Sequence, residues 1–288
     1  MSATARLYRV IGNDRSGNVP AGSVTGVAVV RKVGLFQLQD VLRSRWLTLY
    51  GLFFAALAEG LLRFGGGTSQ ALVGLTQVVL LVVPLVGIVF GTMYLYSARE
   101  YIELLLTQPV RRDQLFGGLY LGLIAPLVAA FVVGVSLPFL IRGVPPDAAG
   151  SLATMLTAGI FLTLVFAGLA FPIAIRNEER ARGLALSLGV WLGLTVVYDA
   201  IILLLLEVAI DYPMELPALI AALVNPVDLA RILLLLQFDV AALMGYTGAV
   251  FERFFGSVLG GLVAFGVLTL WTIAPFALGR CWFRRKDF

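Results

Sequence analysis

Apolar residues dominate six long stretches of the chain, and most charged residues lie between these stretches. A helix rises 1.5 Å per residue, so about 20 apolar residues cross the hydrocarbon core of a bilayer, which is roughly 30 Å thick. Each stretch is at or near that length. The pattern therefore predicts an all-α integral membrane protein with six transmembrane helices. The expected spans are residues 46–62, 71–96, 115–141, 151–175, 183–206 and 255–279.

The pattern divides the chain into three regions. Residues 1–27 have many polar residues and glycines without an apolar core, and we expect a flexible cytoplasmic tail. Residues 28–45 place leucines on one helical face and polar residues on the other, which predicts an amphipathic helix lying in the membrane interface. The alternative is an extension of the first span on its soluble side. Residues 46–288 form the six-helix transmembrane domain. Its outer loop, 207–254, contains apolar runs too short to span, which predict short re-entrant or interfacial helices before the last span.

The distribution of basic residues predicts the orientation of the spans. An even number of spans puts both termini on the same side of the membrane. Of the 21 Lys and Arg residues, the other side holds only Arg63, Arg142, Arg231 and Arg253. Because cytoplasmic loops carry an excess of Lys and Arg, we expect both termini in the cytoplasm and a multi-pass protein of the inner (plasma) membrane. The net charge of +4 then reflects topology, with no nucleic-acid partner.

Composition and motifs exclude most kinds of catalytic site. The chain is 60% hydrophobic and 13% charged, about half the charged fraction of roughly 25% in a soluble domain. It contains no histidine and one cysteine, Cys281. Its only lysines, Lys32 and Lys286, do not follow a glycine, so the ATP-binding loop G-x-x-x-x-G-K-[ST] is absent. We expect a non-catalytic chain that binds no metal and no cofactor itself.

One acidic residue lies inside a predicted span. Asp199 follows Tyr198 and precedes Glu207 by eight residues, which places it about 12 Å inside the outer interface. An ionisable group at this depth costs several kcal/mol unless it is paired or hydrated. Two interpretations are open. Tyr198 and Asp199 line a translocation path, or Asp199 is a structural acid that is protonated or bonded to Ser, Thr or Arg.

The most informative segment on the expected cytoplasmic side is 97–115. Its charges mark an exit from the membrane, yet Leu104, Leu105 and Leu106 are apolar. Pro109 must end or offset one helix before the next begins. We therefore expect a helix–break–helix elbow with an apolar ridge, which indicates a partner surface. The alternative is an elbow that folds back onto the membrane.

The elbow sequence Glu103-Leu104-Leu105-Leu106-Thr107-Gln108-Pro109-Val110-Arg111-Arg112 resembles the membrane subunits of the type-2 ABC exporter superfamily. In that superfamily this elbow is a coupling helix that sits in a cleft of a separate ATPase, which binds ATP and Mg. The interfacial helix before the first span and the re-entrant region before the last are also features of the superfamily. The resemblance implies polar contacts to the ATPase from Glu103, Arg111 and Arg112, apolar contacts from Leu104, Leu105 and Leu106, and an angle set by Pro109. The turn at 176–180 either adds contacts or is a solvated charged turn.

The outer loop carries a narrower resemblance. Asn225-Pro226-Val227-Asp228, then Arg231, Phe238-Asp239 and residues 245–251 are similar to the permeases of the ABC complex that matures nitrous oxide reductase. That family works as a permease homodimer with two cytoplasmic P-loop ATPases and a periplasmic β-helical partner on the outer loops. The resemblance implies that 207–254 docks this partner, through Asn225, Pro226, Asp228, Arg231 and Asp239. The implied cargo is a sulfur species, or the complex helps copper delivery to the reductase.

The residues alone leave other functions open. A permease of the same superfamily exports a lipid, a drug or a glycan, and a non-transporting membrane scaffold would have the same composition. The scarcity of His, Cys and Met provides no evident copper relay within this chain.

Overall fold

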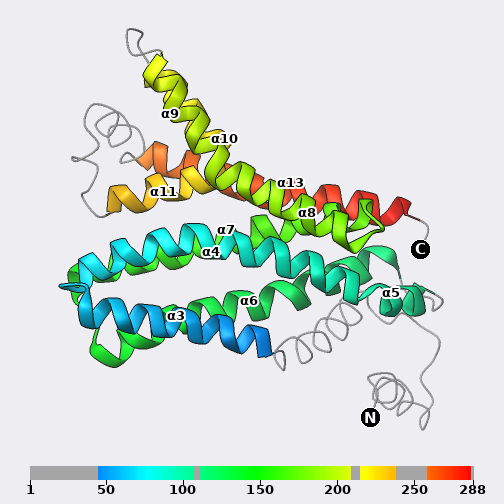
Figure 1. The fold of residues 1–288 in the computed structure, drawn as a ribbon, viewed down its shortest axis with the longest axis horizontal. Helices are drawn as coiled ribbons and strands as arrows, with labels where there is room; N and C mark the ends of the chain where they lie inside the picture. The colour runs from blue at the N-terminus through cyan, green and yellow to red at the C-terminus, as the bar shows by residue number, and fades with distance from the viewer. Residues whose placement is uncertain (1–44, 107–110, 209–214, 238–257, 287–288) are drawn as a thin grey trace.

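A computed structural model describes residues 45–106, 111–208, 215–237 and 258–286 (Figure 1). All regular structure in these residues is helical, so the expected all-α membrane fold is confirmed. The expected tail 1–27 and nearly all of the expected interfacial helix 28–45 lie outside the described residues. The helices are α3 Arg45–Phe64, α4 Thr68–Ser97, α5 Arg99–Leu106, α6 Arg112–Arg142, α7 Pro146–Arg176, α8 Arg180–Leu192, a π-helix Gly193–Val197, α9 Tyr198–Val208, α10 Glu215–Val224, α11 Pro226–Gln237 and α13 Val258–Arg285.

Six of these helical segments are long and apolar enough to cross a membrane, as the sequence predicts. The fifth combines α8, the π-helix and most of α9 into one span, Arg180–Leu205. The bounds of the first five agree with expectation to within five residues. The sixth, α13, continues beyond the expected end at residue 279. Arg280 does not end it, because its guanidinium pairs with Asp113 of α6, with Nε 2.9 Å from Oδ1, and Phe283 beyond it is fully buried.

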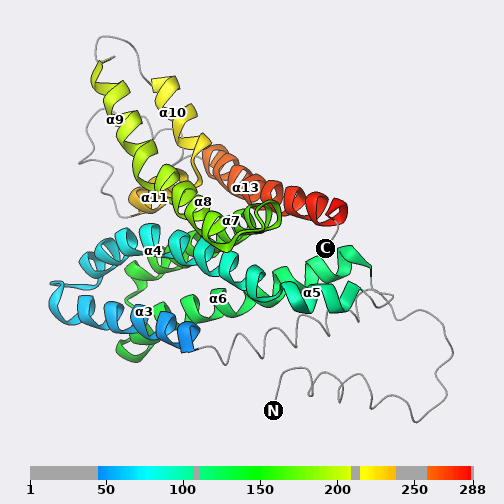
Figure 2. The same cartoon turned by 45° about the vertical axis from the view of Figure 1, so that its right-hand side comes forward.

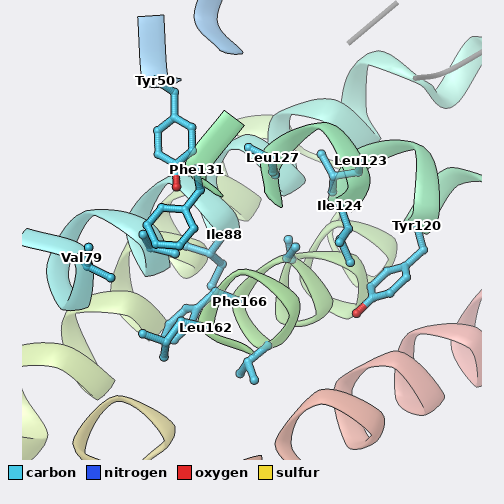
Figure 3. Packing of buried hydrophobic residues seen from close by; sticks show 14 of the residues in the cluster. Tyr50, Val79, Ile88, Tyr120, Leu123, Ile124, Leu127, Phe131, Leu162 and Phe166 are labelled. Atoms are coloured by element: carbon cyan, nitrogen blue, oxygen red, sulfur yellow. The ribbon is translucent and has the colours of Figure 1, made fainter. Parts of the chain in front are cut away.

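The core is built around α7, which packs against α4 along its length and also against α6, α11 and α13. On the far side of the bundle, α3 packs on α6 and α4 (Figure 1). Phe131 of α6, Ile88 of α4 and Phe166 of α7 are fully buried in this core (Figure 3). The four-helix bundle α3, α4, α6 and α7 is therefore a closely packed apolar unit.

Small residues allow these helices to approach closely, as is common in membranes. A Cβ at Gly91 of α4 would lie 2.8 Å from the Cβ of Ala170 in α7, and a Cβ at Gly134 of α6 would lie 2.5 Å from the carbonyl oxygen of Gly51 in α3. Both distances are shorter than van der Waals contact. Glycine is therefore required at both positions by packing.

A second region diverges from this bundle. Helices α9 and α10 extend together away from it, and α10 meets α11 at a bend of 112° (Figures 1 and 2). The two short helices expected before the last span are thus present as α10 and α11. Together with α13 they bury a small separate cluster of apolar residues: Ala222, Leu229, Ile232, Ala264 and Leu268. We refer to α8, the π-helix, α9, α10 and α11 as the arm.

Candidate functional site

Helix α5 connects α4 to α6 and has two unlike faces. Ile102 and Leu105 point into the bundle and are 1% and 4% exposed. Glu103 and Leu104 point outward, with Leu104 47% exposed. Successive residues of a helix are about 100° apart, so Leu104 and Leu105 point in different directions. Leu105 is a core residue and Leu104 is exposed, while the side chain of Leu106 and all of Pro109 lie outside the described part.

The start of α5 is fastened to the α7–α8 turn through Arg99. Its Nη2 donates to the carbonyl oxygens of Ala174, at 3.1 Å, and Asn177, at 2.7 Å. Its Nη1 donates to the carbonyl of Glu178 at 2.9 Å. The last carbonyls of a helix lack partners within it and carry partial negative charge, so a guanidinium there is favourable. The backbone of the turn at 176–180 is bound to the base of α5, while its charged side chains are exposed. The expected ATPase contacts from this turn stay a prediction.

The start of α6, just after α5, is fastened to the end of α13. The Arg112 Nη1 donates to the carbonyl oxygens of Arg284, at 3.0 Å, and Lys286, at 2.7 Å. Arg111 precedes α6 and is exposed. Of the two expected ATPase contacts here, Arg111 therefore faces outward, whereas Arg112 bonds within the chain. The prediction that both contact an ATPase stays a prediction.

Two ionisable groups beside α5 have shifted pKa values because they are desolvated. Burial raises the pKa of Tyr101 to about 12, so its phenol stays neutral at physiological pH. Burial lowers the pKa of Lys286, with a further contribution from the nearby charge of Arg99 and an opposing one from Glu178. The Lys286 Nζ also donates to a backbone carbonyl at the end of α7, at 2.6 Å. The inner side of the elbow is thus a partly dry junction of α5, α7 and α13.

Polar contacts continue from this junction along the seam between α4 and α8. The Tyr96 hydroxyl donates to a carbonyl of the α7–α8 turn at 2.8 Å. One helical turn further, the hydroxyls of Thr92 and Ser187 lie 2.7 Å apart and are fully buried. Further still, the Trp191 Nε1 donates to the Leu81 carbonyl at 3.1 Å. These contacts bind α8 to α4 from the elbow to the edge of the π-helix, and we call them the α4–α8 seam.

Beyond the seam, Asn225 connects the π-helix to α11. Its Nδ2 donates to the Leu194 carbonyl at 2.7 Å, and its Oδ1 accepts from the Val227 amide at 3.0 Å. The second contact caps α11, as asparagine does before a helix that begins with proline. A π-helix changes the register of backbone hydrogen bonds, and here the side-chain amide binds a carbonyl of the altered turn. Asn225 itself is completely buried.

An ion-pair network lies directly beside this contact. The Arg231 Nη1 is 2.6 Å from Asp199 Oδ2 and 2.8 Å from Asp228 Oδ1, and Asp228 Oδ2 accepts from Asn225 at 3.1 Å. All three charged side chains are partly buried, at 28%, 27% and 14% exposure for Arg231, Asp199 and Asp228. We call Asp199, Asn225, Asp228 and Arg231 the α9–α11 cluster. Of the two interpretations of Asp199, the structure has the acid bonded to arginine.

The structure therefore joins two sites that the sequence kept apart. Tyr198 and Asp199 were expected on a translocation path, and Asn225, Pro226, Asp228, Arg231 and Asp239 on a docking platform. Tyr198 donates its hydroxyl to the Ala221 carbonyl of α10 at 2.7 Å, next to the cluster. Pro226 is buried at the start of α11, and Asp239 lies outside the described residues. Docking and translocation roles for these residues stay predictions.

Sequence reasoning missed Arg99 and the seam hydroxyls. Arg99 lies in the first turn of α5, where a cation opposes the helix dipole. That mismatch was a usable signal that its guanidinium serves another helix. Thr92 and Ser187 gave no such signal, because each lies in a long apolar span. Among the described residues, no group of three or more His, Cys, Asp and Glu side chains converges on a common metal site.

Comparison with known proteins places this architecture in a family. The sequence profile of the ABC-2 family transporter proteins matches residues 67–288. The chain is 30% identical over 277 residues to a probable ABC transporter permease protein NosY of Pseudomonas aeruginosa, covering 90% of this chain and 98% of the relative. It is 28% identical over 222 residues to a protein of the same name from Stutzerimonas stutzeri, covering 70% of this chain and 80% of the relative.

Proposed function

The chain belongs to the ABC-2 transporter family, and we propose that it is the permease subunit coupling a separate cytoplasmic ATPase to export or to a signal across the membrane. The working complex contains two copies of this chain and two P-loop ATPase subunits, which bind the ATP and Mg. This chain supplies no catalytic group. It supplies the membrane path and the lever that transmits movement of the ATPase.

The observation that carries this proposal is the way α5 is mounted. It presents Glu103 and Leu104 outward, while Ile102 and Leu105 hold it to the bundle. Arg99 secures the junction before it to α7. A helix held this firmly transmits a push as a rigid lever, whereas a loosely attached elbow would absorb it.

The orientation follows the placement of charge. Arginines gather at the end of the bundle that holds α5 and the end of α13, which fits a cytoplasmic side. The bend between α10 and α11 then belongs to the periplasmic half. In this arrangement closure of the two ATPases displaces α5, and the arm changes shape at the other side. A periplasmic partner on 207–254 responds only if it binds the two shapes differently.

The biological task we propose is maturation of nitrous oxide reductase. Support comes from similarity to the NosY permeases over nearly the full length of this chain. The complex would pass a sulfur species outward or assist copper delivery, and a soluble periplasmic partner of β-helical fold would carry any copper. Export of a lipid, a drug or a glycan is the rival within the same family.

Exposed residues of α5 provide the first test. Glu103→Lys and Leu104→Asp alter the outward face and leave the buried face intact. In the reconstituted complex we expect each to lower permease-dependent ATP hydrolysis at least tenfold, or to release the ATPase. Arg182→Glu reverses an exposed charge on the neighbouring helix α8 and is the matched control, with activity near that of the unaltered chain. Wild-type hydrolysis in both α5 variants would refute the coupling assignment.

Purification in mild detergent tests the biological task. We expect a P-loop ATPase and a periplasmic β-helical protein to accompany this chain from its native membrane. Recovery of the ATPase alone would favour a general exporter. Recovery of neither would favour a scaffold and contradict the proposal.

A further inference from the structure

We infer that the α9–α11 cluster is a latch that closes α11 onto the π-helix of the fifth span, and that Asn225 and Arg231 are positioning residues for transmission through the membrane. The existence of the latch depends only on the geometry of this chain. Its opening during the ATPase cycle rests on the proposed function.

Contacts around α9 explain why a latch is needed there. The fifth span buries few residues, and Ile201, Leu203 and Leu204 of α9 are 50%, 68% and 65% exposed. Apolar packing therefore does little to fix α9 in place. The contacts that hold this segment are polar: Asn225 to the Leu194 carbonyl, Arg231 to the Asp199 carboxylate, and the Tyr198 hydroxyl to the Ala221 carbonyl of α10. Asn225 caps α11 and Arg231 lies within it, and α11 is itself packed on α7 and α13.

The π-helix gives this span a way to move. It accommodates one extra residue relative to an α-helix, and such turns are frequent at functional sites. Each residue of an α-helix advances the chain by about 100°. Return of Gly193–Val197 to α-helical register would therefore rotate α9 by roughly that angle relative to α8. Such a rotation carries Asp199 away from Arg231 and changes the direction of the Leu194 carbonyl, so both arms of the latch break together.

The latch lies between α8, which is linked to α5 through the α7–α8 turn, and α11, which packs on α7 and α13. On one side, α8 is bound to α4 through the buried Thr92–Ser187 contact and to the elbow through the α7–α8 turn. On the other side, Asn225 and Arg231 belong to the α11 end of the arm. Displacement of α5 therefore strains the π-helix against α11. The π-helix has two possible arrangements, π-helical and α-helical, and such a strain can switch it from one to the other.

Charge makes the latch a discrete switch. In the closed state Arg231 is bonded by two carboxylates, and Asp228 also accepts from Asn225. An open latch separates the guanidinium from the Asp199 carboxylate within a membrane span, where unpaired charges are unfavourable unless water enters. The ion pair is therefore either closed, or open with water around both charges, and intermediate states are unfavourable.

Isosteric substitutions test the closed latch without removing core volume. Asn225→Asp keeps an oxygen to cap α11 but loses the donor to the Leu194 carbonyl. Asp199→Asn keeps the shape and removes the charge that pairs with Arg231. The matched control is Ser151→Ala, which deletes a contact between α7 and the Gln237 carbonyl at the far end of α11. The purified full-length permease in lipid nanodiscs is the sample, without ATPase.

Backbone hydrogen exchange of residues 193–199 is the first readout. We expect exchange at least tenfold faster in Asn225→Asp and Asp199→Asn than in the unaltered chain, with Ser151→Ala unchanged. Unchanged exchange in both latch variants would overturn the latch. This readout does not depend on the ATPase, so it stands even if the proposed function fails.

Coupling in the reconstituted complex is the second readout. We expect the latch variants to bind the ATPase normally. We also expect the permease-dependent maturation or transport per ATP hydrolysed to fall at least fivefold. Faster exchange with wild-type coupling would overturn the transmission role. Failure of the unaltered chain to bind any ATPase would instead refute the proposed function.

Discussion

The four-helix bundle and the arm are held together by different kinds of contact. Within the most apolar 18 residues of each span, 72% are buried in α7 and only 6% in the span of α8, the π-helix and α9. The bundle is closed by fully buried side chains such as Phe54, Phe131 and Phe166. Within the arm, α11 packs on α7 and α13 through apolar residues, whereas α9 is mostly exposed and is held by a small number of polar contacts.

This difference has a physical consequence in a membrane. Lipid tails are as apolar as leucine, so exposure of the α9 leucines costs little, and helix association depends on close packing and on polar contacts. Many small contacts over a large buried area resist displacement in every direction. A few directional contacts release together once their geometry changes. The bundle is thus suited to serve as a frame, and the π-helix with α9 as the moving part.

The largest expected effect compares one truncation to alanine in each of the two regions. Phe131→Ala removes a fully buried ring that packs edge-on against Phe54, with centroids 5.3 Å apart, and we expect a loss of about 3–5 kcal/mol. Leu203→Ala on the exposed face of α9 should change stability by about 0.5 kcal/mol or less. Thermal unfolding of both variants in nanodiscs measures the difference. Similar losses would show that the arm is packed as tightly as the bundle.

The next effect concerns the junction that joins α5 to the arm. Arg99→Gln removes charged hydrogen bonds to the end of α7, and we expect a loss of about 2 kcal/mol together with reduced coupling. Arg99→Lys keeps the charge but cannot reproduce the bonds of both Nη atoms, so it should rescue only part of the loss. Thermal unfolding and permease-dependent ATP hydrolysis are the two measurements.

A surface arginine provides the control for this junction. Arg182 pairs with Glu179 at 2.8 Å, but its side chain is 79% exposed, and exposed pairs contribute about 0–1 kcal/mol. Arg182→Gln should therefore leave both measurements close to those of the unaltered chain. Equal losses in the Arg99 and Arg182 variants would contradict a special role for the junction.

The smallest effect is expected at the α4–α8 seam. Thr92→Val and Ser187→Ala each remove one partner of a buried contact of 2.7 Å. A double-mutant cycle in lipid should give a coupling of about 0.6 kcal/mol, the usual size for such bonds between membrane helices. Thermal or chemical unfolding of the two single variants and the double variant supplies this value. A coupling near zero would mean that the hydroxyls do not join the helices.

The sequence predicts the helices of both regions but not the polar contacts between them, for a physical reason. A span is recognisable because its length and apolarity are local properties of the sequence. The elbow containing α5 is recognisable because its charged residues interrupt two apolar spans. The Asp199–Arg231 pair joins residues that are far apart in the chain, and no local sequence pattern shows that they are close in space. Leu105 shows the same limit of sequence-based prediction. The sequence alone does not show which of three consecutive leucines faces the bundle.

The backbone hydrogen-bond register of a helix also cannot be predicted from its amino-acid composition. Nothing in the residues Gly193–Val197 distinguishes a π-helix from a continued α-helix. The bond between the Asn225 amide and the Leu194 carbonyl became apparent only once the fifth span and α11 were placed together.

Transmission from α5 to the α9–α11 cluster is tested most directly by hydrogen exchange of residues 193–199 in the assembled complex, compared between nucleotide-free and ATP-trapped states. Our interpretation predicts that ATP speeds this exchange in the unaltered chain and that Arg99→Gln abolishes the change while the ATPase stays bound. Exchange that does not respond to ATP, or that responds equally in the Arg99→Gln variant, would contradict it.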